Sequence, residues 1–169
     1  MSTAKDLNLA YARAGLLSQR MEEELSRQLT REFEAAYLYY SMSAYAESLN
    51  LDGFARWLFV QAQEELEHGN RIFRYLVDRD GHITWAPISA PRDKFDSMLD
   101  VFEAAVEHER ALGAEFEKIS TRAGEEKDNT TRDFLNWFLR EQVEEVALTE
   151  NVRDKLRIIG GSGDGAGLV

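Results

Sequence analysis

Cysteine is absent from the 169 residues of the chain, and proline occurs only twice. Without cysteine, the protein can form no disulfide, thiolate metal site, iron–sulfur cluster or cysteine nucleophile. Pro87 and Pro91 lie close together, so the long stretches on either side are free of the residue that breaks helices. No segment approaches the ~18 apolar residues of a membrane-spanning helix, and no early apolar run resembles a signal peptide. We therefore expect a cytoplasmic protein with no membrane partner.

Basic residues are outnumbered, with 20 lysines and arginines against 31 aspartates and glutamates and a net charge of −11. A surface of this sign repels nucleic-acid phosphates and attracts cations. Hydrophobic residues make up 44% of the chain, which is enough for one globular domain with a core of its own. The composition predicts cations, and not nucleic acids, as partners.

Apolar residues recur at helical spacing in long segments, which predicts four helices at about 18–48, 53–78, 93–122 and 130–159. The expected N-terminal caps are Ser18, Asp52, Asp93 with Asp96, and Thr130 with Asp133. Asp80-Gly81 predicts that the second helix ends with a residue in the left-handed backbone conformation. Two short loops and one long connection between these helices indicate an all-α four-helix bundle.

The long connection, residues 81–92, holds both prolines and has no helical pattern. It is long enough to cross the face of the bundle, so we expect the third helix to run parallel to the second. Residues 1–17 are expected to form an N-terminal extension, 18–159 the bundle, and 160–169 a glycine-rich tail.

Each expected apolar stripe is interrupted near its middle by a glutamate. Glu32 lies seven residues after Leu25 and seven before Tyr39, so it points in the same direction as they do. By the same spacing, Glu65 lies between Leu58 and Ile72, Glu109 between Phe102 and Phe116, and Glu145 between Phe138 and Val152. A buried, uncompensated carboxylate costs several kcal/mol, and these stripes carry no lysine or arginine. The pattern predicts bound cations, unless the four acids reach a solvated bundle centre.

His68 lies three residues after Glu65, so the two share a helix face and can offer an oxygen and a nitrogen to one ion. Four carboxylates with one neutral imidazole would be neutralised by two divalent cations. Such oxygen-rich ligands suit iron or manganese better than a soft metal, although zinc would also bind.

A second acidic group follows on the last helix, where Glu141, Glu144 and Glu145 lie within about one turn and Gln142 lies three residues before Glu145. With Glu64, these acids could hold a third cation, or they could form an ordinary solvated face. Tyr39 and Trp137 are either core aromatics or one-electron donors beside a redox metal. His82 and His108 are expected at the surface.

Four motifs as a set resemble the non-haem bacterial and archaeal ferritins over about 18–159. They are REFEAAYLYYSMSAY with Glu32 and Tyr39, QAQEELEH ending at His68, VEHE ending at Glu109, and FLNWFLREQVEEVAL with Glu141 to Glu145. The resemblance implies a ferroxidase centre. Glu32, Glu65 and His68 would hold one iron, and Glu65, Glu109 and Glu145 a second, with Glu65 bridging and Gln142 near the second. Glu64, Glu141, Glu144 and Glu145 would form a third site.

The resemblance further implies a protein that oxidises Fe(II) with O2 or H2O2 and stores ferric mineral inside a homo-oligomeric shell of 24 subunits. Bacterioferritins carry a methionine where Leu66 stands and a second Glu-x-x-His motif on the last helix, so no haem is expected here. The short fifth helix of the family has no counterpart before Val169.

Two other functions remain open. A DNA-protecting mini-ferritin would use basic N-terminal residues, but the N-terminal segment holds only Lys5 and Arg13. A rubrerythrin-like di-metal oxidase or peroxidase would be accompanied by a Cys-x-x-Cys module, which this chain lacks.

Overall fold

The computed structural model describes residues 17–161, which form four α-helices and no strand. They are α2 (Gln19–Ser48), α3 (Asp52–Asp78), α4 (Met98–Glu125) and α5 (Asn129–Gly161). The expected all-α four-helix architecture is confirmed. Most of the expected extension (1–16) and tail (162–169) lie outside the described residues. No helix in the described part has the length and hydropathy needed to cross a membrane.

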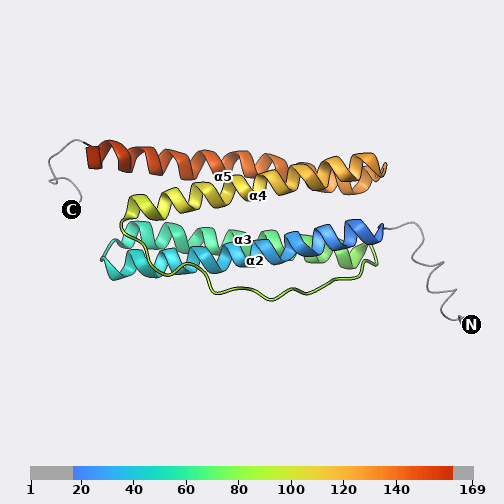
Figure 1. Ribbon diagram of the computed structural model, residues 1–169, viewed down its shortest axis with the longest axis horizontal. Helices are drawn as coiled ribbons and strands as arrows, with labels where there is room; N and C mark the ends of the chain where they lie inside the picture. Colours follow the sequence, from blue (N-terminus) through green and yellow to red (C-terminus); the bar gives the residue numbers. More distant parts are fainter. Residues whose placement is uncertain (1–16, 162–169) are drawn as a thin grey trace, which may run out of the picture.

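Two antiparallel hairpins make up the bundle (Figure 1). One consists of α2 and α3 and the other of α4 and α5, and α2 also packs against α4. The connection between α3 and α4 runs back along the length of the first hairpin, so these two helices point in the same direction. This connection fits the crossover expected from the two prolines.

Helix starts agree with the sequence in one case and differ in three. Ser18 caps α2, and its hydroxyl accepts a hydrogen bond from the Met21 N–H. Asp52 is already helical, and its predecessor Leu51 makes no side-chain cap. The expected cap at Asp93 is wrong because α4 begins only after Ser97, whose hydroxyl accepts a hydrogen bond from the Asp100 N–H.

Asp100 explains the late start of α4, because its carboxylate accepts the Asp96 N–H and pairs with Arg92, which holds the preceding segment outside the helix. For α5, the carboxylate of Asp128 accepts the Thr131 N–H, in place of the expected cap at Thr130. The expected left-handed end of α3 is present at Asp80, whose φ is 52°.

Two apolar clusters form the core and occupy opposite ends of the bundle. One contains Met42, Leu58 and Phe102, and the other contains Leu25, Ile72, Phe116 and Phe138. On α5, Leu148 and Ile159 are exposed although they are apolar. The stripe follows Phe138, Gln142, Glu145, Thr149, Val152 and Leu156, at alternating steps of four and three residues, and Leu148 lies off that line. The central acids lie between the two clusters.

Candidate metal centre

Four buried glutamates, one from each helix, lie at the centre of the bundle. Glu32 and Glu109 are 0% exposed, Glu65 is 2% exposed and Glu145 is 4% exposed. His68 is buried with them, at 6% exposure. No lysine or arginine forms an ion pair with any of these glutamates in the described part of the chain. The sequence pattern therefore located a group of acids that lies inside the protein and that no lysine or arginine within residues 17–161 neutralises.

Glu32, Glu65 and His68 come close enough to share one ion. One ligand atom from each lies within 4.8 Å of the others. His68 Nδ1 is 3.4 Å from Glu65 Oε2 and 3.6 Å from Glu32 Oε2, which is ion-pair range but too far for good hydrogen bonds. Accordingly, both carboxylate oxygens are buried without a hydrogen-bond partner among the described residues. Buried oxygens of this kind, next to an imidazole, fit a hard or borderline divalent cation.

His68 also belongs to a second group, with Glu141 and Glu145, whose ligand atoms again lie within 4.8 Å. Glu145 Oε2 is a further buried oxygen without a partner in the described part. Of the other residues expected at a third site, Glu64 accepts a hydrogen bond from Gln61, and Glu144 is exposed. The structure thus brings two of the four expected acids together with His68, and not with Glu64 or Glu144.

Glu109 differs from the other acids because both of its oxygens already accept hydrogen bonds. The Tyr39 hydroxyl donates to Oε1 at 2.5 Å, and the Gln142 amide donates to Oε2 at 2.5 Å and to the Glu109 carbonyl at 2.9 Å. A Cβ at Gly113 would lie 2.8 Å from Gln142 Cγ, so the glycine leaves the space in which Gln142 reaches Glu109. Glu109 can join a cation only while sharing its oxygens with these two donors.

Gln28 is a further residue at this site and was not identified from the sequence. It is 0% exposed, and its amide donates to Glu32 Oε1 at 2.5 Å. This bond occupies one oxygen of Glu32 and leaves the other facing His68. The signal was present in the sequence, because Gln28 lies four residues before Glu32 and therefore shares its inward face.

The pKa values in the group reflect burial and crowding of like charges. Burial raises the pKa of Glu65 well above its usual range, as does the charge of Glu32 and Glu109. The pKa of Glu145 rises to about 7, through burial and then through the charges of Glu109 and Glu64. Burial opposes protonation of His68, but the Glu32 and Glu65 carboxylates outweigh it and raise its pKa to about 10. Without cations, the group therefore retains protons that metal binding must displace.

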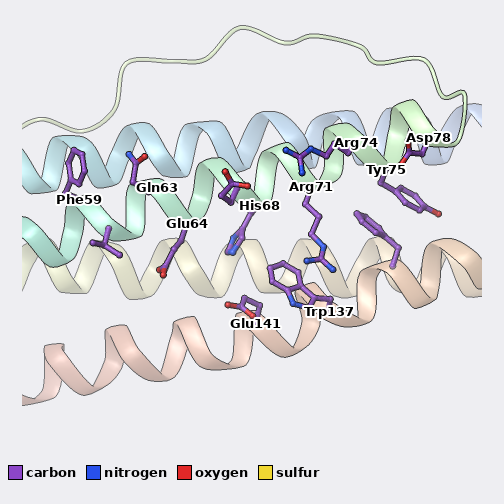
Figure 2. Close-up of a pocket in the computed structure, with 13 residues that line it drawn as sticks. Phe59, Gln63, Glu64, His68, Arg71, Arg74, Tyr75, Asp78, Trp137 and Glu141 are labelled. Carbon is purple, nitrogen blue, oxygen red and sulfur yellow. The ribbon is translucent and has the colours of Figure 1, made fainter.

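A pocket of about 710 Å³ opens beside His68, between α3 and α5. Figure 2 shows Glu64 and His68 reaching into it from α3, and Glu141 and Trp137 from α5. The centres of the Trp137 and His68 rings are 5.4 Å apart, and the guanidinium of Arg71 lies over the Trp137 ring, 4.0 Å from its centre. This pocket gives small ions a way to His68 from outside the bundle.

The two remaining histidines have different environments. His82 is exposed, as expected, in the connection between α3 and α4. His108 was also expected at the surface, but it is half-buried, and its Nε2 has no contact with solvent and no hydrogen-bond partner among residues 17–161. Turning about 100° from Glu109 takes His108 away from the bundle centre, but the side chain remains half-buried, where the charges of Glu32 and Glu34 on α2 act on its pKa.

Comparison with known proteins identifies relatives over most of the chain. The sequence profile of the ferritin-like domain matches residues 22–159. A bacterial non-heme ferritin of Staphylococcus aureus is 39% identical over 145 residues, which cover 86% of this chain and 87% of the relative. The open pore ferritin of the archaeon Archaeoglobus fulgidus superimposes with a TM-score of 0.85 at 38% identity, over 88% of this chain and 90% of that chain. The Chlorobium tepidum ferritin gives a TM-score of 0.83 at 31% identity, over 85% and 88% of the two chains.

Proposed function

Since the chain belongs to the ferritin-like domain family, we propose that it stores iron and oxidises Fe(II) at its buried acidic centre. In this proposal iron is the substrate, O2 or H2O2 accepts the electrons, and no haem takes part. Each Fe(II) gives up one electron and is retained as Fe(III). The names of the relatives support iron storage, whereas the oxidation step rests on the site itself.

The observation that carries the proposal is the cluster of Glu32, Glu65 and His68, with two buried carboxylate oxygens that receive no hydrogen bond from the described part of the chain. We assign these residues to a first Fe(II), and Glu65, Glu109 and Glu145 to a second, with Glu65 between the two. A third ion would be held by Glu141 and Glu145, whose ligand atoms lie close to His68, with Glu64 and Glu144 as further ligands on the resemblance alone. Concentrated negative charge favours the ferric over the ferrous ion, because the ferric ion carries one more positive charge.

The remaining residues hold these carboxylates in place. Tyr39 and Gln142 fix Glu109, and Gln28 fixes Glu32, so each acid presents a defined oxygen. Burial and the nearby charge of Glu109 raise the pKa of Tyr39 well above its usual range, so its hydroxyl remains a donor to that carboxylate. Preorganised ligands of this kind need little rearrangement when the ion arrives.

Storage requires a compartment, and we propose that the chain assembles into a hollow homo-oligomeric shell in the cytoplasm, with 24 subunits as in the family it resembles. The net charge of −11 supports this role, because an acidic interior collects ferrous ions and favours deposition of the oxidised product. The acidic surface also argues against nucleic acid as a partner.

The decisive experiment combines anaerobic Fe(II) titration with aerobic oxidation and particle sizing. We expect about two to three Fe(II) per chain, absorbance growth from ferric product on exposure to O2, and hollow particles that retain the iron. Particles of 12 subunits that retain DNA at low salt would instead indicate a mini-ferritin. Rapid peroxide turnover without retained iron would indicate a rubrerythrin-like oxidase or peroxidase.

Replacing Gln28 with leucine should weaken the first Fe(II) site. The leucine fills the space but frees Glu32 Oε1, so the carboxylate loses its fixed orientation, and we expect about tenfold lower affinity. Anaerobic titration measures the effect. Thr30→Val is the matched control, because Thr30 is buried on the same helix and its hydroxyl donates to the Ser26 carbonyl and not to a glutamate of the described centre. Equal affinities in the two variants would remove Gln28 from the site.

A further inference from the structure

The imidazole of His68 makes no hydrogen bond to another residue in the described part of the chain. The nearest carboxylate oxygens, on Glu65 and Glu32, lie 3.4 and 3.6 Å from its Nδ1, which is too far for good hydrogen bonds. Metal-ligating histidines almost always donate their other ring N–H to a carboxylate, a carbonyl or water, and this bond sets the orientation of the ring. Within residues 17–161, the protein can orient this ring only through packing.

Two aromatic rings of α5 pack edge to face against this imidazole. The ring centres of His68 and Trp137 are 5.4 Å apart with an angle of 80° between the planes, and those of His68 and Phe138 are 6.1 Å apart at 82°. Trp137 and Phe138 also meet edge to face, at 4.8 Å and 84°. Aromatic groups favour this arrangement, and here it restricts rotation of the imidazole.

The two rings are held in place in different ways. Phe138 belongs to the core, where it is 1% exposed and stacks on Phe116 at 4.7 Å. Trp137 is half-buried and lines the pocket, and the guanidinium of Arg71 covers the face of its indole at 4.0 Å from the ring centre. Arg71 forms no ion pair with an acid among residues 17–161, so the indole is the contact that holds its guanidinium there.

Trp137 reaches across the pocket from one helix to the other. Among residues 17–161 the backbones of α3 and α5 do not approach each other closely, and the pocket lies between them. His68 and Arg71 are three residues apart on α3 and share a face, and Figure 2 shows both side chains reaching toward Trp137. The indole therefore couples the position of the imidazole to α5, which also carries Glu145.

We propose that Trp137 is a positioning residue for the metal centre and that Arg71 holds its indole against His68. The indole keeps the imidazole turned so that Nδ1 faces the carboxylates of Glu32 and Glu65, and an arriving cation meets ligands that are already oriented. In this role Trp137 neither binds the ion nor gives up an electron. The inference rests on the proposed function, because it needs His68 to bind a cation.

The first test measures the affinity of the assembled, chelator-treated protein for Co(II) in the absence of oxygen. Trp137→Leu should bind Co(II) about tenfold more weakly than the wild type, because leucine has no ring to pack against the imidazole. Trp137→Phe keeps a ring and should stay within about threefold of the wild type.

Phe134→Leu is the matched control for Trp137→Leu. Phe134 stacks on Tyr75 at 3.8 Å and so also links α5 to α3, but its ring contacts in the described part do not include His68. Phe138 keeps its stack on Phe116 in this variant, so Co(II) affinity should equal that of the wild type. Equal affinity in Trp137→Leu and the wild type would overturn the positioning role, as would equal losses in Trp137→Leu and Phe134→Leu.

A spectroscopic signature separates positioning from a general loss of packing. The visible absorption bands of bound Co(II) depend on the geometry of its ligands. At saturating Co(II), these bands should shift in Trp137→Leu and stay unchanged in Phe134→Leu. Unshifted bands in Trp137→Leu would show that the imidazole keeps its orientation without the indole, and would overturn the proposal.

The role of Arg71 is tested by removing and then restoring its charge. Arg71→Gln removes the cation over the indole and should weaken Co(II) binding about threefold, whereas Arg71→Lys supplies another cation and should regain the wild-type affinity. If both variants bind as weakly as each other, or if neither differs from the wild type, Arg71 does not hold the indole through its charge.

A comparison with His68→Ala separates this inference from the proposed function. If His68→Ala loses Co(II) affinity but Trp137→Leu binds like the wild type, the positioning role alone is wrong. If His68→Ala also binds like the wild type, His68 is not a ligand, and the proposed centre and the positioning role are both wrong.

Discussion

Replacing Glu65 with alanine should leave a folded bundle that oxidises Fe(II) at least about 100-fold more slowly than the wild type. Glu65 has a buried oxygen that accepts no hydrogen bond from residues 17–161, lies beside His68, and is assigned to both ions of the pair. Its loss removes the only ligand that the two ions are proposed to share. His68→Ala should act in the same direction, because His68 belongs to both groups of ligand atoms.

The measurement is the initial rate of ferric absorbance after mixing with air-saturated buffer, at several Fe(II) concentrations. Glu47→Ala is the control, because Glu47 is an exposed acid on α2 that lies outside the candidate site. Circular dichroism checks that each variant retains its helices. If Glu65→Ala and His68→Ala both oxidise iron at the wild-type rate, the centre has been placed wrongly, whatever family the chain belongs to.

The second large effect concerns the metal-free protein, which Glu145→Gln should stabilise at pH 8 by up to about 3 kcal/mol. The pKa of Glu145 is raised from 4.5 to about 7 in the fold, so the folded state favours the protonated acid. Stabilisation by this group is fully present below pH 4.5 and is lost as the pH rises through about 7. Glutamine stays neutral at every pH, so the Glu145→Gln variant does not lose this stabilisation.

The pH dependence separates this effect from a general change in packing. The two proteins should unfold at similar urea concentrations at pH 4.5 and diverge as the pH rises to 8, with chelator present and the protein concentration fixed. Glu117→Gln removes an exposed charge from α4 and should show no such divergence. Excess Zn(II) should make the wild type more stable than Glu145→Gln at pH 8, because only the wild type keeps the full set of ligands. If the two proteins differed in stability by the same amount at every pH, the effect would not come from the titration of Glu145.

Heptad spacing was sufficient to predict which acids lie inside. Glu32, Glu65, Glu109 and Glu145 each lie seven residues from apolar neighbours on both sides, and a helix long enough to keep that register must turn all of them inward. Gln28 could have been found by the same rule, because amides on an inward face need a partner.

Other features depended on contacts that periodicity does not encode. His108 is turned away from the centre, but whether that direction leads to water or to another helix depends on which helices are neighbours. The start of α4 was set by Asp100, which binds Arg92 and the Asp96 N–H and so delays the helix beyond the expected aspartates. Similarly, the grouping of Glu141 with His68, and not with Glu144, depends on how α5 faces α3 across the pocket.

The connection between α3 and α4 divides the proposed ligands between two covalent halves. The first hairpin supplies Glu32, Glu65 and His68, the second supplies Glu109 and Glu145, and residues 79–97 are the one stretch of backbone that joins them. A protease that cut this stretch would release two fragments, neither of which could complete a pair of ions by itself. Cations bound across the interface would then keep the severed molecule together, so iron content would govern how well it survives such damage.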